Sequence, residues 1–103
     1  MRNLSPGDIA ADVTAGKLPL IDVRTAEELA IVRLPQARHI PMDQIPARLA
    51  DLNPQQPVAI LCHHGGRSLQ VAHYLERNGF ADVINVAGGI DAWADLDPTL
   101  PRY

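Results

Sequence analysis

The chain has 103 residues, a formal net charge of −3, 47% hydrophobic residues and 20% charged residues, and this composition predicts a single globular domain over residues 1–103. The negative charge and the lack of a long apolar stretch argue against nucleic acid or a membrane as a partner. The only cysteine, Cys62, cannot form an internal disulfide, so we expect a reducing compartment, the cytoplasm.

Short helical and strand patterns alternate along the chain, separated by nine prolines and seven glycines. Ser5 is the expected cap of the first helix, Pro6 its first residue and Gly16 its end. In chain order the patterns predict helices over 5–16, 25–32, 43–52 and 68–79, a further helix beginning within 88–93, and strands over 18–23, 37–42, 57–62 and 81–86.

This alternation indicates an α/β domain with a central, mainly parallel sheet of about five strands and helices on both faces. The apolar run 57–62 is the clearest buried strand and is expected at the centre of the sheet. Ligands bind outside the carboxyl ends of strands in such sheets, and Cys62 stands at that end of the run.

The stretch CHHGGRS, Cys62 to Ser68, joins this strand to the next helix. A thiol is a nucleophile only as the thiolate, and a helix N-terminus stabilises an anion through unpaired N–H groups and the helix dipole. Gly65 and Gly66 let successive N–H groups converge. Arg67 adds a positive charge, and Ser68 can cap the helix or donate to the anion. The stretch therefore predicts a cradle for a negative charge on, or attached to, the Cys62 sulfur.

Simpler interpretations of this cysteine are less favoured. An inert buried thiol has apolar neighbours, which the residues after Cys62 do not provide. A metal site from Cys62, His63 and His64 is disfavoured because adjacent residues converge poorly on a tetrahedral ion, so we expect no metal and no cofactor. His39 and His73 are interpreted as surface or partly buried structural residues. Attack on phosphorus by a phosphatase and attack on a sulfane sulfur by a sulfurtransferase both stay open at this point.

Two stretches outside the loop resemble signatures of the single-domain rhodanese-like sulfurtransferases, and the similarity covers nearly the whole chain. NVAGGIDAW is similar to the second signature, and LIDVRTAEELAIVRLPQARHIP is similar to the first. The matching residues are Asp22, Val23, Arg24, Glu28, Pro35, Ala37, Ile40 and Pro41 in the first signature and Gly88, Gly89, Ala92 and Trp93 in the second, whereas Val32, Arg33 and Gln36 depart from the Gly, His and Gly of the first.

The resemblance also bears on the choice between sulfur and phosphorus. The spacing from Cys62 to Arg67 is C-x4-R, as in the rhodanese-like family, whereas related phosphatases of the same fold have C-x5-R. The family implies a cycle in which Cys62 takes a sulfane sulfur from thiosulfate or a persulfide, holds it as a persulfide on the N–H groups of residues 63–68, and passes it to a thiophilic acceptor. Arg67 would stabilise the donor or the persulfide.

The remaining residues around the loop and in the second signature are expected to have the following roles. His63 and His64 would either line the mouth of the site or be solvated loop residues. Asp22 and Arg24 are interpreted as structural residues near the site, with Arg24 paired to Glu28 four residues along the chain. Trp93 is expected in the core.

The kind of acceptor is suggested by CHHGGRS and the ending DPTLPRY, which look most like rhodanese-like domains appended to enzymes that adenylylate sulfur-carrier proteins. The acceptor could thus be a small thiol or a sulfur-carrier protein. The alternatives are a phosphatase or arsenate reductase with the same cradle, and a regulatory module of this fold without catalysis. Inactive relatives usually lack the cysteine, which counts against the last.

Overall fold

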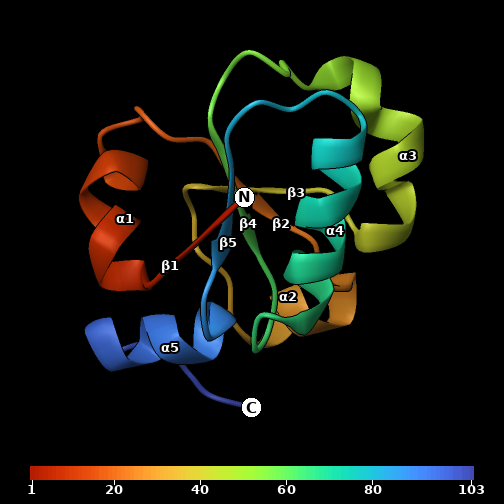
Figure 1. Cartoon of the computed structure of the whole chain (residues 1–103). Coiled ribbons are helices and arrows are strands. Elements are labelled where there is room, and N and C mark those ends of the chain that lie inside the picture. The colour runs from red at the N-terminus through yellow and green to blue at the C-terminus, as the bar shows by residue number, and fades with distance from the viewer.

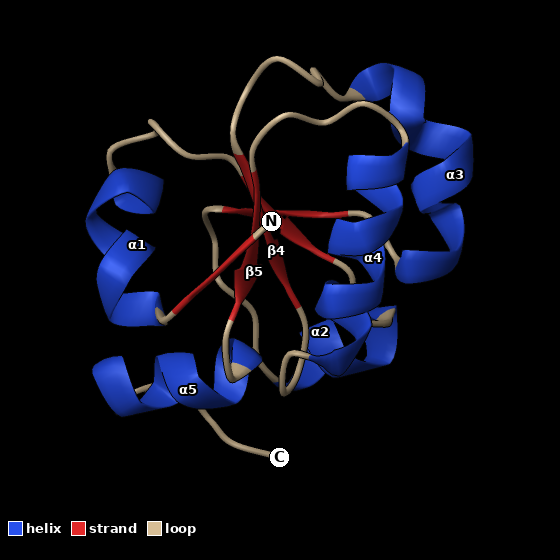
Figure 2. Ribbon diagram, in the orientation of Figure 1, coloured by secondary structure: helices blue, strands red, loops and turns tan.

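All five strands run parallel in one sheet, in the order β1–β5–β4–β2–β3. The computed structural model describes residues 1–103, and the sheet separates two layers of helices (Figure 2). The strands are β1 (Arg2–Leu4), β2 (Leu20–Asp22), β3 (Ala37–His39), β4 (Val58–Leu61) and β5 (Val83–Val86). The run expected at the centre is β4, which pairs with β2 and β5. The predicted α/β fold and its central strand are therefore confirmed.

Helices cover both faces of the sheet (Figure 1). Residues of α1 (Pro6–Thr14) and α5 (Gly89–Leu96) pack on one face, and residues of α3 (Ile45–Arg48) and α4 (Gly66–Arg77) pack on the other. The short helix α2 (Ala26–Ile31) follows β2. The helix predicted over 43–52 is three short turns, with 3-10 turns at Met42–Gln44 and Leu49–Asp51 on either side of α3.

The central strand supplies side chains to two separate cores, because successive residues of a strand point to opposite faces of the sheet. Ala59 and Leu61 belong to the core under α1 and α5, which also contains Trp93 as expected. Ile60 and Cys62 belong to the core under α3 and α4. Strands that are buried on both faces read as continuous apolar runs, which explains why β4 is so clear in the sequence.

The edge strand β1 was not predicted. It has three residues, two of them exposed, and it pairs with β5 through Arg2 to Ile84 and Leu4 to Val86. Three residues with this pattern carry no usable periodicity. This strand therefore depends on a partner at the other end of the chain.

The turn from β5 into α5 comes into direct contact with the stretch that follows β4. The Ile90 N–H donates to the Cys62 carbonyl oxygen at 2.9 Å, and the Asp91 N–H donates to the His63 carbonyl oxygen at 3.1 Å. Gly89 has a φ of 62°, and a Cβ atom there would lie within 2.5 Å of the Cys62 carbonyl oxygen. Only glycine permits this approach, so the second signature holds the backbone of the cysteine loop.

A buried ion pair lies where β2 ends. The Arg24 Nη2 donates to the Asp22 Oδ2 at 2.7 Å and to the Val32 carbonyl oxygen at 2.8 Å, and the Asp22 and Arg24 side chains are 1% and 0% exposed. The predicted pairing of Arg24 with the Glu28 carboxylate is wrong. Arg24 precedes the first residue of α2, so helical i to i+4 spacing does not apply to it, and its side chain turns inward to Asp22.

We expect Gly89→Ala to lower the free energy of unfolding by roughly 3–5 kcal/mol, because it adds a clash with the loop carbonyls to the cost of a left-handed backbone. Gly79→Ala is the matched control, since Gly79 has a φ of 89° but no atom within 4 Å of a Cβ, and it should lose about 1–2 kcal/mol. Urea denaturation followed by circular dichroism measures both. Equal losses would show that close approach is not what requires Gly89.

Asp22→Asn should lower the free energy of unfolding by about 3–5 kcal/mol, because it leaves the Arg24 charge buried without its counter-ion. Asp51→Asn removes a carboxylate from an exposed ion pair with Arg48 at 2.7 Å and should change stability little. The same urea titration compares the two variants. If Asp22→Asn lowers the free energy of unfolding no more than Asp51→Asn does, the buried pair has no structural role.

Candidate active site

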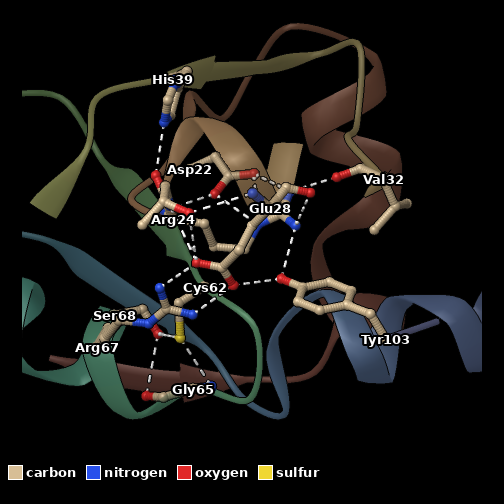
Figure 3. Close-up of polar contacts among 11 residues, drawn as sticks. Asp22, Arg24, Glu28, Val32, His39, Cys62, Gly65, Arg67, Ser68 and Tyr103 are labelled. Atoms are coloured by element: carbon tan, nitrogen blue, oxygen red, sulfur yellow. Dashed lines mark hydrogen bonds and ion pairs between the residues drawn. The ribbon is translucent and has the colours of Figure 1, made fainter. Parts of the chain in front are cut away.

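The Cys62 side chain lies directly after β4, at the carboxyl edge of the sheet, and it is 1% exposed. The Gly65 N–H donates to the Cys62 Sγ, with 3.0 Å between nitrogen and sulfur, and the Ser68 Oγ lies 3.2 Å from the same sulfur (Figure 3). The sulfur therefore sits inside a turn of backbone that offers it a hydrogen-bond donor.

This turn forms because Gly65 takes a left-handed conformation, with φ of 109°, and caps the start of α4. The first residues of a helix have N–H groups without an intrahelical acceptor, and the helix dipole places partial positive charge there. α4 begins at Gly66, two residues before the predicted start. Ser68 therefore lies within the first helical turn, where its hydroxyl faces the sulfur instead of capping the helix.

Ser68 continues into a buried polar chain that the sequence analysis did not identify. Its hydroxyl donates to the Asn85 Oδ1, and the Asn85 Nδ2 donates to the Asn3 Oδ1 at 2.9 Å. A hydroxyl has one hydrogen to donate, and the Asn85 Oδ1, the Gly65 carbonyl oxygen and the Cys62 sulfur all lie within hydrogen-bond distance of the Ser68 hydroxyl. The signal for Asn85 is its place as the one polar residue of the buried strand β5.

The Arg67 guanidinium makes a two-pronged ion pair with Glu28, with Nη1–Oε1 and Nη2–Oε2 distances of 2.5 and 2.8 Å. Figure 3 shows the guanidinium on the same side of Glu28 as the Cys62 sulfur. The hydrogen bonds from Arg67 hold the pKa of Glu28 far below its ordinary value, and those to Glu28 raise the pKa of Arg67. The arginine expected at the site is present, but its charge is already paired.

Tyr103 joins this group from the far end of the sequence. Its hydroxyl donates to the Glu28 Oε2 at 2.6 Å and accepts from the Arg24 Nη1 at 3.0 Å. Its ring stacks on His63, with centroids 3.8 Å apart and an interplanar angle of 7°, and its main-chain oxygen lies 2.9 Å from the His63 Nε2. No local pattern in the sequence marks Tyr103, because residues 97–103 form neither helix nor strand.

The histidines occupy three different environments. The His63 ring lies against Tyr103 and His64, with both centroid distances 3.8 Å, whereas the His64 side chain is 66% exposed. His39 is partly buried and its Nε2 lies 2.7 Å from the Arg24 carbonyl oxygen, which fits its structural interpretation. His73 is exposed on α4, as expected for a surface residue.

An open hollow of about 460 Å³ lies beside Arg67. Its wall comes from the stretch after β2, the stretch after β3 and one residue of α4. These residues are Val23, Arg24, Thr25, Pro41, Met42, Asp43 and Arg67. A reactant that occupied this hollow would meet the Arg67 side of the cysteine loop. A second hollow of about 340 Å³, lined in part by Pro19 and Phe80, borders the start of β4 and not the thiol.

The geometry thus brings together Cys62, Gly65, Arg67 and Ser68 of the predicted loop and packs the His63 ring against His64 and Tyr103. The Asp22–Arg24 pair is linked to Glu28 through the Tyr103 hydroxyl. The geometry adds Glu28, Asn85 and Tyr103. Chemically, the arrangement offers one nucleophile next to oriented backbone dipoles and a paired arginine. That is a site for an anion carried on or by sulfur.

No helix of the structure has both the length and the apolar character needed to cross a membrane.

A family model described as "Rhodanese-like domain" matches residues 5–96. The chain is 41% identical over 75 residues to a protein named "Sulfurtransferase" from Allochromatium vinosum, covering 73% of this chain and 70% of that one.

Two further similar proteins carry the same domain name as the matching family model. The chain is 42% identical over 89 residues to "Rhodanese-like/PpiC domain-containing protein 12, chloroplastic" from Arabidopsis thaliana, covering 82% of this chain but only 30% of that longer protein. The crystal structure of a rhodanese-like domain protein from Staphylococcus aureus superposes with a TM-score of 0.85 and 38% identity, covering 100% of this chain and 99% of the other. The family model, the sequence identities and the fold agree, and the chain belongs to the rhodanese-like domain family.

Proposed function

We propose that the domain transfers sulfane sulfur through a persulfide on Cys62. The observation that carries this proposal is the hydrogen bond from the Gly65 N–H to the Cys62 Sγ at 3.0 Å, made at the N-terminus of α4. A backbone donor aimed at a buried sulfur stabilises the thiolate and, after transfer, a persulfide anion that extends from it. A relative named "Sulfurtransferase" supports the general activity.

The chemistry needs two displacements at sulfur. The Cys62 thiolate attacks the outer sulfur of thiosulfate, the S–S bond breaks, and sulfite leaves with the bonding electron pair. An acceptor thiolate then attacks the terminal sulfur of the Cys62 persulfide, the acceptor becomes the persulfide, and the Cys62 thiolate leaves. A persulfide donor enters the same cycle with a thiolate as the leaving group. No cofactor takes part in either step.

The partners follow from this cycle. The donor is a small molecule such as thiosulfate or a persulfide, and the acceptor is a small thiol or a sulfur-carrier protein, with cyanide as the acceptor in an assay. The single free thiol suits the reducing conditions of the cytoplasm, where it would not be lost to a disulfide.

Phosphoryl or arsenate chemistry at the same thiol is the competing proposal. It would require three oxygen atoms to be seated above the sulfur, within a loop of C-x4-R spacing. The sulfur already has Gly65 N at 3.0 Å and Ser68 Oγ at 3.2 Å, and Arg67 is turned to Glu28. A persulfide adds only one atom, so this tight turn favours sulfur.

Cys62→Ser should abolish sulfur transfer and leave the fold intact, because serine is close in size and the loop N–H groups remain. In intact-mass measurements, thiosulfate should add one sulfur atom to the wild type and none to the variant, and cyanide should remove it. Unfolding curves of the two proteins, measured in parallel, control for folding. A variant that still takes up sulfur would place the chemistry at another residue.

The wild type should hydrolyse p-nitrophenyl phosphate no faster than Cys62→Ser does, because the short loop does not seat a phosphate. The thiosulfate:cyanide assay on the same preparation shows that the thiol is intact. Phosphatase turnover that depends on Cys62 and exceeds its sulfur transfer would reverse the order of the two proposals.

A further inference from the structure

Both arginines near the thiol are paired with carboxylates. Arg24 is paired with Asp22 and Arg67 is paired with Glu28, so two positive and two negative formal charges cancel. Asp91, near the exposed His64, forms a further ion pair with Arg102 at 3.2 Å. The cradle therefore consists of backbone dipoles in a setting whose nearby side-chain charges are balanced.

Glu28 is the residue that balances Arg67. Both of its oxygens accept from the guanidinium, and one of them also accepts from the Tyr103 hydroxyl. The Glu28 side chain is 17% exposed and that of Arg67 is 36% exposed. This carboxylate also accepts from the Thr25 N–H and hydroxyl, which makes five hydrogen bonds in all. An anion that sought the Arg67 guanidinium would thus have to displace a firmly held carboxylate, and that carboxylate would also repel it.

We propose that Glu28 is a positioning residue that sets donor specificity. By holding and neutralising Arg67, it disfavours small dianionic donors such as thiosulfate and favours donors that bring the sulfane sulfur with less charge, namely persulfides of thiols. This inference rests on the proposed sulfur transfer. The favoured step is attack of the Cys62 thiolate on the outer sulfur of R–S–SH, which gives the Cys62 persulfide and releases R–S⁻.

Charge, and not shape, is the discriminating property here. The Cys62 persulfide is the same whichever donor supplies the sulfur, so the sulfur-loaded enzyme does not distinguish the donors. The donor's charge acts during approach, where opposite charges accelerate association and like charges slow it. Removing the Glu28 charge should therefore improve the use of a dianion more than the use of a monoanion.

The first test needs no sulfur transfer. Iodoacetate, an anion, and iodoacetamide, which is uncharged, alkylate the same thiol and are nearly equal in size. The rate with iodoacetate divided by the rate with iodoacetamide therefore reports the local charge, because the effect of burial on the two rates cancels. Glu28→Gln should raise this ratio about tenfold at low salt. Glutamine removes the charge and keeps one of the two oxygens, which can still accept from Thr25 and Arg67. Glu27→Gln is the matched control, because Glu27 lies in the same helical turn but is exposed and bonds to neither Thr25 nor Arg67. It should change the ratio by less than about twofold.

The second test compares two donors of similar chemistry, thiosulfate with two negative charges and methanethiosulfonate with one. We expect Glu28→Gln to raise kcat/KM for thiosulfate relative to methanethiosulfonate by about tenfold, mainly through a lower KM. Glu28→Asp, which keeps the charge, should stay within about threefold of the wild type. A purely structural role for Glu28 would lower both donors' rates together and leave their ratio unchanged.

The outcomes separate this inference from the proposed function. If the alkylation ratio shifts but neither donor loads sulfur onto Cys62, the charge balance stands and sulfur transfer fails. If both donors load sulfur but the ratios in Glu28→Gln equal those in Glu27→Gln, the role of Glu28 is overturned. The wild type provides a test without any variant: a balanced site predicts an alkylation ratio that changes little with salt, and an unpaired Arg67 would make the ratio fall steeply.

Discussion

The carbonyl groups of Cys62 and His63 accept hydrogen bonds from the first turn of α5, and the conformation of the whole cysteine loop depends on this contact. These carbonyls are held against α5, and the chain then turns back so that the Gly65 N–H reaches the sulfur. The contact requires two chain segments to approach more closely than any Cβ allows, and this is why Gly89 stands at the junction. Cys62 and the distant Gly89 therefore form one structural unit.

The same loop shows how an anion can be stabilised without net charge. The Gly65 N–H at the start of α4 donates to the sulfur, while the two nearby arginines are engaged by Asp22 and Glu28. Dipoles fixed by the fold need no reorganisation when the sulfur gains or loses charge. In the proposed cycle the paired side chains influence mainly which reactant approaches, and we propose that stabilisation of the intermediate and choice of donor rest on different groups.

The fold could be predicted wherever a residue's surroundings leave a local pattern. β4 is buried on both faces and therefore reads as a continuous apolar run, and α1 shows its cap and first-turn proline at Ser5 and Pro6. β1 has no such pattern, because it is short, mostly exposed and paired with only one neighbouring strand. The start of α4 was misplaced by two residues, since glycines that form a helix cap look the same in sequence as glycines in a loop.

The sequence by itself determined that a lone thiol follows the central strand and precedes a helix, and that its loop has C-x4-R spacing. Only the tertiary structure decided which residues the side chains around that thiol bond to. Arg67 pairs with a residue 39 positions away, Tyr103 bonds to one 75 positions away, and Ser68 bonds to Asn85 on a neighbouring strand. Local periodicity reports the face that a residue buries, whereas charge pairing depends on which segments the sheet order brings together. Arg24 therefore pairs with Asp22, and Glu28 pairs with Arg67.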